Sequence, residues 1–210
     1  MAELHLPDVS EFQPNVDWPA VAKHNGGAAI IRALYGAEHV DKVWAAGRRH
    51  AAHKAGIGVL GIYQYLRADE DPVAQARAFV SQVGKLNRGE FAVLDLEEGS
   101  GAQSHRAKAW LDHVDEHLTY GGYHRAWLYS GDAFLRNQLA PFVGPQDRSR
   151  RIWVADYGAK PDVRHDLWQH TDGTHAVPND WHQHGWPGIG RCDCSVFGGT
   201  LQEFRAKVFG

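Results

Sequence analysis

Short apolar segments alternate with amphipathic segments along almost the whole chain, and this alternation restricts the fold more than any other feature of the sequence. Most of the apolar segments are apolar on both faces, which is typical of strands in a parallel sheet covered by helices. The expected strands are 4–9, 28–35, 59–66, 91–97, 125–129, 152–157, 166–170 and 192–197. The segments with helical spacing of apolar residues are 18–24, 41–55, 72–86, 104–118, 133–139 and 201–208.

About eight strands that alternate with helices favour a closed barrel over an open sheet. The last three strands follow one another without room for full helices, so the barrel should be irregular. We therefore predict an α/β fold, a single-domain irregular (β/α) barrel with about eight mostly parallel strands and about five main helices. No internal repeat, charge block or low-complexity linker divides the chain, so residues 1–210 are expected to form one domain.

The charge balance excludes two classes of partner. The chain has 22 Lys and Arg against 25 Asp and Glu, a formal net charge of −3, and no basic block. We therefore expect neither nucleic acid nor a membrane surface as a partner. No apolar run approaches the roughly 20 residues of a membrane span. The first seven residues contain neither the basic nor the apolar stretch of a signal peptide, so the protein is either made without a secretion signal or has lost one.

The segment 91–99 is an apolar run that ends abruptly in carboxylates and then breaks at glycine. In a strand, Asp95 and Glu97 would point to the same face, roughly 6–7 Å apart, and Glu98 to the other face. Two acids on one face hinder each other's ionisation. Such a pair suits acid-catalysed cleavage of a glycosidic bond, although acids that cap a helix or pair with arginines would give the same short pattern.

Further acids are expected beside this pair. The carboxyl ends of parallel barrel strands converge on one rim, where ligands bind. Asp8 and Asp156 lie near the ends of their strands, and Asp193 lies in the last strand. Because the last strand of a closed barrel lies beside the first, Asp193 and Asp8 should be neighbours. A ring of acids at one opening differs from ordinary surface charge, in which lysines are interspersed.

Seven ordered motifs extend from the first expected strand to the last. They are DVSEFQ at 8–13 with VDW at 16–18, GIYQY at 61–65, LDLE at 94–97, LYS at 128–130, IWVADY at 152–157, LWQH at 167–170, and Asp193 before SVF at 195–197. In this order they resemble glycoside hydrolase family 25, whose members are muramidases (lysozymes) that cut bacterial peptidoglycan. The resemblance covers essentially the whole chain, and it implies the same kind of barrel.

The resemblance also implies roles for particular residues. Glu97 matches the general acid, Asp95 its partner carboxylate, and Asp8 and Asp193 the remaining acids of the site. The positions that match the sugar groove are Tyr63, Tyr65, Tyr129, Trp153, Asp156 and Trp168. The chain departs from the family pattern at Gln64, where a histidine is common, and at the cysteines on either side of Asp193.

The implied reaction is cleavage of the β-1,4 bond between N-acetylmuramic acid and N-acetylglucosamine. Glu97 would protonate the leaving oxygen. Asp95 could attack the sugar directly, or it could steady an N-acetyl group that attacks in its place. The resemblance favours the second, retaining route, and the sequence leaves both open.

The resemblance also shapes what we expect of the protein as a whole. It should be a monomer with one catalytic domain, no separate cell-wall-binding domain and no cofactor. It should act on the wall after release from the cytoplasm, as phage endolysins do, or after secretion if a signal has been removed.

Two other functions fit part of the pattern. Chitinase-like barrel enzymes also use D-x-E on the fourth strand, but their longer signature needs aspartates where this chain has Glu90 and Val93. A non-catalytic glycan-binding protein would keep the aromatic groove and lose the acid, whereas both Asp95 and Glu97 are present here.

A metal site is a third alternative. Cys192 and Cys194, with His182 and His184 close before them, are side chains of the types that bind zinc. In an extended strand, both cysteines would face away from Asp193 and lie about 7 Å apart, too far for an unstrained disulfide. Buried free cysteines and polar loop histidines explain the same residues, so we expect no metal.

Overall fold

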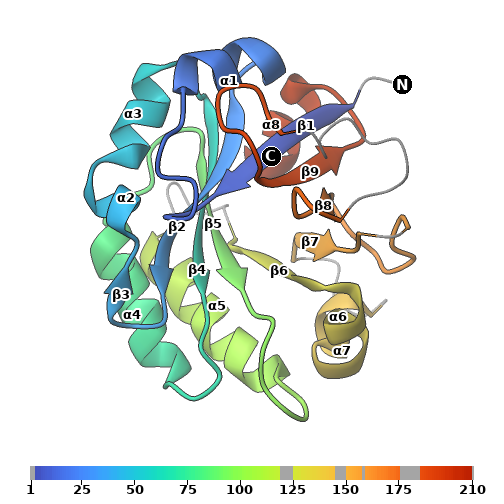
Figure 1. Cartoon of the computed structure of the whole chain (residues 1–210). Coiled ribbons are helices and arrows are strands. Elements are labelled where there is room, and N and C mark those ends of the chain that lie inside the picture. The colour runs from blue at the N-terminus through green and yellow to red at the C-terminus, as the bar shows by residue number, and fades with distance from the viewer. Residues whose placement is uncertain (1–2, 119–124, 145–149, 158, 176–184, 210) are drawn as a thin grey trace.

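The computed structural model describes residues 3–118, 125–144, 150–157, 159–175 and 185–209 (Figure 1). The strands are β1 Leu4–Val9, β2 Ala28–Tyr35, β3 His39–Val40, β4 Val59–Tyr65, β5 Glu90–Asp95, β6 Trp127–Gly131, β7 Ile152–Ala155, β8 Leu167–Thr171 and β9 Asp193–Phe197. The helices are α1 Trp18–Asn25, α2 Lys42–Ala45, α3 Arg48–Lys54, α4 Pro72–Val83, α5 Ser104–Leu118, α6 Asp132–Gln138, α7 Ala140–Val143 and α8 Leu201–Phe209.

The strands form a closed barrel. The order around it is β1-β9-β8-β7-β6-β5-β4-β2, and the β1–β2 pairing closes the ring. All neighbours are parallel except β9, which runs antiparallel to both β8 and β1. The two-residue strand β3 lies outside the ring and pairs with β2. This arrangement confirms the predicted irregular, mostly parallel α/β barrel.

Two expected helices have different bounds because of glycines. The helix expected over 41–55 is two helices, α2 and α3, separated at Gly47, whose φ of 93° is left-handed. The helix expected over 72–86 ends at Val83, because Gly84 has a φ of 66°. Glycine adopts this conformation at little steric cost, so each glycine ends a helix that the apolar spacing alone would continue.

The alternation of side chains along the strands builds two cores. In β5, Phe91 and Val93 point into the barrel, whereas Ala92 and Leu94 point outward and pack in the layer that includes α4 and α5. Because of this alternation, Asp95 points toward the barrel interior and Leu96 toward the outer layer. The strand that supplies the core thus delivers a carboxyl to the mouth of the barrel.

Helix α8 closes the end of the barrel opposite those carboxyls. Its fully buried Phe204 contacts Phe91, Trp127 and Phe197 from the barrel interior, with ring centroids 5.1–6.2 Å apart. Phe91 lies near the start of β5, whereas Asp95 is its last residue. The interior is therefore filled by aromatic side chains at one end and open only at the other. Among the described residues, no helix is both long and apolar enough to cross a membrane.

We expect Phe204→Ala to lower the free energy of unfolding by about 3–5 kcal/mol, because it removes a fully buried ring from a closely packed barrel. Phe12→Ala is the matched control. Phe12 is 78% exposed and should cost less than about 1 kcal/mol. Equilibrium urea unfolding followed by circular dichroism measures both. Equal midpoints for the two variants would contradict the closure of the barrel by α8.

Candidate active site

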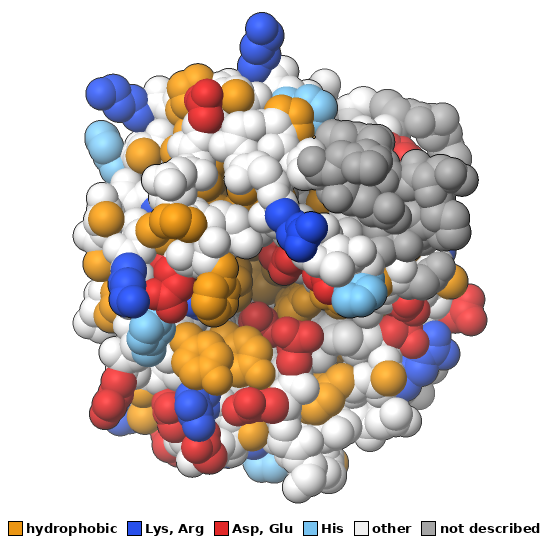
Figure 2. Space-filling view, in the orientation of Figure 1, with side chains coloured by type: hydrophobic (Ala, Val, Ile, Leu, Met, Phe, Trp, Pro, Cys, Tyr) orange, Lys and Arg blue, Asp and Glu red, His pale blue; other side chains and the backbone are white. Residues whose placement is uncertain are grey.

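Four carboxyl groups from three strands meet at the open end of the barrel. Asp8 in β1 and Asp193 in β9 are partners in the register of these strands, and Asp95 is the last residue of β5. Glu97 follows β5 on the same inward row. All four line one cavity of about 220 Å³. Figure 2 shows acidic side chains on the floor and rim of this hollow, with hydrophobic side chains beside them.

The four carboxyls differ in their access to solvent. Asp8 and Asp95 are only 5% and 6% exposed, and Asp193 is half-buried. Glu97 alone among them is exposed. A ligand entering the cavity therefore meets Glu97 first, whereas Asp95 lies deeper in the wall of the barrel.

Asp95 and Glu97 influence each other's ionisation. A hydrogen bond between the two side chains contributes to the shifts in their pKa values, and such a bond forms only when one of the two carboxyls is protonated. Desolvation of the carboxyl groups by the protein atoms that surround them is the main cause that raises the pKa of both, even though the Glu97 side chain as a whole is exposed. The negative charge of Glu97 raises the pKa of Asp95 further, and the hydrogen bond itself lowers that of Glu97. The pair thus retains a proton at a pH where isolated carboxyls would both be ionised.

Asp8 and Asp193 form a second pair of carboxyls that influence each other's ionisation. Burial and the charge of Asp193 raise the pKa of Asp8 well above its ordinary value. Burial, and then the charge of Asp172, raise the pKa of Asp193 to about 7. The mouth of the barrel therefore carries less negative charge than its four acids suggest.

Gln169 in β8 connects this second pair to the wall of the cavity. Its Nε2 donates to both carboxylate oxygens of Asp8, at 3.2 and 3.1 Å. Its Oε1 accepts from the hydroxyls of Tyr129 and Tyr157, at 2.8 and 2.9 Å. Sequence analysis did not select Gln169, although it lies within the LWQH motif. In the structure Leu167 points into the barrel, and alternation along the strand makes Gln169 do the same.

Arg32 is a cation in the lining of the same cavity. Its Nε donates to Asp41 at 3.1 Å, and its terminal nitrogen donates to Glu11 at 2.9 Å. Its charge lowers the pKa of Asp95, but this effect is smaller than the opposing effects of burial and of Glu97. Arg32 therefore moderates the cost of the buried carboxyls without removing it.

Four of the predicted groove residues, Tyr63, Tyr65, Tyr129 and Trp153, line the cavity. Trp153 packs on Tyr129 with ring centroids 4.2 Å apart, and its indole nitrogen donates to Ser195 at 2.8 Å. Asp156 lies instead in an adjoining cavity of about 440 Å³, whose lining includes Asp132 and Phe134. Glu97 lines both cavities, so it stands where they meet.

Trp168 is placed away from these two cavities. It lies on the outward face of β8, where it packs against the outer core and donates to the carbonyl of Asp156 at 2.8 Å. Its predicted contact with sugar stays a prediction. Gln64, where the family motif often has histidine, is buried and accepts from the indole of Trp110 at 2.7 Å. This departure from the family pattern therefore concerns packing between β4 and α5.

Two further aromatic residues adjoin the cavity and were not selected from the sequence. Phe12 lines it and is largely exposed, with Arg32 5.3 Å from its ring centroid. Tyr35 stacks on Tyr65 with centroids 4.7 Å apart and an angle of 13° between the rings. Aromatic faces of this kind suit the apolar faces of sugar rings. Phe12 falls inside the DVSEFQ motif, which was the signal available for it.

Neither of the two cysteines considered as zinc donors from the sequence lines the cavity. His182 and His184 lie outside the described residues. Cys192 and Cys194 are buried and form no disulfide, and both pack in the outer core, on the face of β9 opposite to Asp193. A metal held by these cysteines would be separated from the carboxyls by the sheet.

A closed α/β barrel whose mouth gathers carboxyls that retain protons, with aromatic side chains around them, is the framework of a glycoside hydrolase. The sequence profile of glycosyl hydrolases family 25 matches residues 7–178. The chain belongs to this family, which confirms the resemblance found in its motifs.

Comparison with individual proteins agrees with this assignment. The chain is 29% identical to the uncharacterized protein YegX of Escherichia coli K12 over 99% of its length and 74% of that protein. A bacterial lysozyme from Streptomyces coelicolor has a similar fold, with a TM-score of 0.79, 21% identity, and coverage of 99% and 98% of the two chains. The catalytic domain of endolysin ply40 from a Listeria phage also has a similar fold. Its TM-score is 0.75 at 23% identity, and the match covers 99% of this chain and 97% of the endolysin domain.

We expect Asp95→Asn to raise the melting temperature at pH 7 and to raise it less at pH 3.5. The unfolded chain releases the Asp95 proton near its ordinary pKa of about 3.9, whereas in the folded protein the pKa is raised. As the pH rises above about 3.9, the unfolded state is therefore favoured until the folded carboxyl also ionises. A neutral amide removes this cost. Thermal unfolding followed by circular dichroism measures the shift.

The matched control is Asp69→Asn. Asp69 is exposed, and its hydrogen bond to Arg67 lowers its pKa. Ionisation of Asp69 therefore stabilises the folded protein, whereas ionisation of Asp95 destabilises it. Its substitution should leave the melting temperature unchanged or lower it at pH 7. A lower melting temperature for Asp95→Asn at pH 7 would contradict the account of a buried carboxyl that resists ionisation.

Proposed function

We propose that the protein is an N-acetylmuramidase, which cleaves the β-1,4 bond between N-acetylmuramic acid and N-acetylglucosamine in peptidoglycan. One observation carries this proposal. Glu97 is accessible, has a raised pKa, interacts with the buried Asp95, and stands where two cavities meet. A glycan strand that occupied both cavities would have the bond between two of its sugars beside Glu97.

In this mechanism Glu97 is the general acid. The Asp95–Glu97 pair holds one proton, and the exposed member is the one that can pass it to a bound glycan. As the bond from the anomeric carbon breaks, the leaving oxygen takes the proton from Glu97. The resulting Glu97 carboxylate can then accept a proton from the water that completes hydrolysis.

The geometry supports the substrate-assisted route over direct attack by Asp95. A carboxylate nucleophile of a retaining glycosidase lies about 5–5.5 Å from the acid, across the scissile bond. Asp95 and Glu97 lie on one strand face and interact with each other, so Asp95 is beside the acid and not across the scissile bond from it. We therefore assign to Asp95 the role of holding the N-acetyl group, whose carbonyl oxygen attacks the anomeric carbon from the opposite side of the ring.

The other carboxyls and the aromatic residues complete the proposed site. Asp8 and Asp193 would stabilise the positive charge that develops on the sugar ring. Tyr63, Tyr65, Tyr129 and Trp153 would contact one sugar, and Asp156 would contact the sugar on the other side of Glu97.

The structure offers no support for the chitinase-like alternative. Val93 is buried in the barrel interior. Glu90 is ion-paired with Arg49 at 2.6 Å and with His53 at 2.7 Å, at the end of β5 opposite the cavity. The residues in place of the two earlier aspartates are therefore structural.

Glu97→Gln should fold normally and lose activity on purified cell walls by about 100- to 10,000-fold, which is the usual contribution of a general acid. Glu98→Gln is the matched control. Glu98 accepts hydrogen bonds from the Tyr65 hydroxyl at 3.3 Å and the Ala68 amide at 2.8 Å and should retain most of the activity. Release of reducing ends measures both. Substantial activity in Glu97→Gln would contradict the assignment of Glu97 as the general acid.

The pH dependence of kcat/KM should fall on the alkaline side with an apparent pKa above about 4.3, the ordinary value for glutamate, because Glu97 must be protonated and its pKa is raised. In Asp95→Asn the residual activity should decline at a lower pH. Residue 95 would then carry no negative charge, so the proton of Glu97 would be lost at a lower pH. Initial rates on soluble wall fragments measure this shift, and an unchanged alkaline limb would contradict the coupling.

A further inference from the structure

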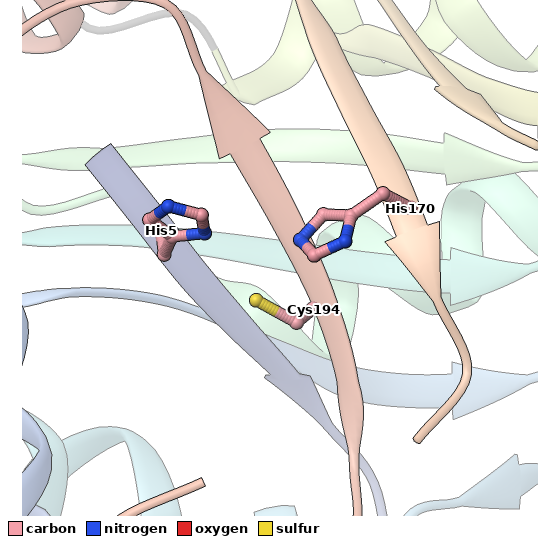
Figure 3. A group of neighbouring side chains, drawn as sticks. All are labelled: His5, His170 and Cys194. Carbon is pink, nitrogen blue, oxygen red and sulfur yellow. The ribbon is translucent and has the colours of Figure 1, made fainter. Parts of the chain in front are cut away.

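Three potential metal ligands converge on the outer face of the barrel, on the opposite side of the sheet from the carboxyls. They are His5 of β1, His170 of β8 and Cys194 of β9, and their ligand atoms all lie within 4.8 Å of one another (Figure 3). These strands are adjacent, because β9 pairs with both β1 and β8. The cluster therefore joins β1, β8 and β9 where antiparallel pairing closes the barrel, which we call the closing seam.

The backbone holds each of the three side chains in place. The register pairs His5 with Val196 and Cys194 with Pro7, so both side chains lie on the outward face of neighbouring strands. The pairing of β8 with β9 shifts between Gln169 and Thr171, which makes His170 the extra residue of an irregularity. Such irregularities redirect a side chain, and this one directs His170 toward Cys194.

From this cluster we infer a zinc site, in which one nitrogen of each imidazole and the Cys194 thiolate bind the ion. Two histidines and a cysteine are ligands that zinc prefers. Ligand atoms bound to one tetrahedral zinc ion lie about 3.3–3.7 Å apart, given bonds of about 2.0–2.3 Å. The observed limit of 4.8 Å is within reach of small side-chain rotations. Binding would convert the Cys194 thiol to a thiolate and release its proton.

The surroundings suit a site that is mostly enclosed but can be reached. His170 is 4% exposed and Cys194 is fully buried, whereas the His5 side chain is 26% exposed. His5 therefore provides the entry path, and a fourth position remains for water or another donor. A carboxylate oxygen of Glu3 lies 3.9 Å from His5 Nε2. Carboxylates beside the second nitrogen of a histidine are typical outer partners of zinc sites, and Glu3 is near enough to take this position after a small side-chain rotation.

The competing explanation is packing alone. The rings of His5 and His170 meet edge to face with centroids 5.7 Å apart, and Trp168 contacts His170 in a similar way. The Cys194 thiol donates to the carbonyl of Ser195 at 3.7 Å, a weak hydrogen bond. Packing alone does not require three zinc-type ligand atoms to converge within 4.8 Å of one another, so the geometry favours a metal.

A metal here would act on the carboxyl site through the backbone. His170 follows Gln169, which binds Asp8, and Cys194 follows Asp193, the hydrogen-bonded partner of Asp8. Fixing His5, His170 and Cys194 to one ion would hold β1, β8 and β9 together. We therefore assign the ion a structural role at the closing seam of the barrel.

The test is zinc binding by the full-length protein after removal of metals with a chelator. We expect one equivalent of zinc, a melting temperature that rises with zinc concentration, and, with cobalt in place of zinc, a thiolate-to-metal charge-transfer band. Cys194→Ser should abolish the band and the stoichiometric binding. Cys192→Ser is the matched control, because Cys192 is buried on the same face but lies outside the cluster, and it should bind as the wild type does.

His5→Gln provides a second variant at a partly exposed position, where the fold should tolerate the change. We expect it to bind zinc at least about tenfold more weakly than wild type, with circular dichroism showing an unchanged fold. The inference is overturned if the folded wild-type protein binds no zinc. It is equally overturned if Cys194→Ser or His5→Gln folds and binds zinc as tightly as Cys192→Ser, because the ion would then lie elsewhere.

Discussion

Strand β9 closes the barrel between β1 and β8, and the arrangement of the site depends on this closure. Because β9 runs antiparallel to both neighbours, its first residue, Asp193, comes level with Asp8 near the end of β1. The same pairing brings Gln169 of β8 within hydrogen-bonding distance of Asp8. Without this closing strand, Asp8 would lose both the amide that orients it and the neighbouring carboxyl that raises its pKa.

The electrostatics of the mouth explain how such a site can be both costly and useful. Buried carboxyls that resist ionisation destabilise the folded protein at neutral pH, and the aromatic barrel interior under α8 offsets that cost. The same resistance keeps a proton on the Asp95–Glu97 pair, which an acid catalyst needs. The difference in exposure then divides the roles, since Asp95 is buried and Glu97 is exposed.

The sequence predicted what depends on strand period and strand order. Alternation along 91–97 placed Asp95 and Glu97 on the inward row, and closure of the barrel placed Asp193 beside Asp8. The sequence could not predict which carboxyls share protons, because that depends on burial. The family resemblance selected Trp168 of the LWQH motif and did not select Gln169. Both faces of β8 carry residues that suit a ligand. Only the packing of Leu167 in the barrel shows which of the two faces points inward.

The outer face shows the same limit more strongly. Sequence proximity grouped Cys194 with the histidines of the preceding loop, whereas the sheet brings it to His5 and His170, from the two neighbouring strands. Contacts between strands distant in sequence are set by register and irregularities in the pairing, which no local pattern reveals. The break at Gly47 is a simpler case, because a left-handed glycine ends one helix and begins another inside a continuous apolar pattern.

The central claim is that the Asp95–Glu97 pair retains a proton where isolated carboxyls would lose theirs. A carbon-13 NMR titration of the glutamate and aspartate side-chain carboxyls tests it most directly, with Glu97→Gln and Asp95→Asn used to assign the two signals. The account predicts that both carboxyls titrate above their ordinary values of about 4.3 and 3.9, and that each signal responds to ionisation of the other. Independent titration of Glu97 at or below about 4.3 would contradict it.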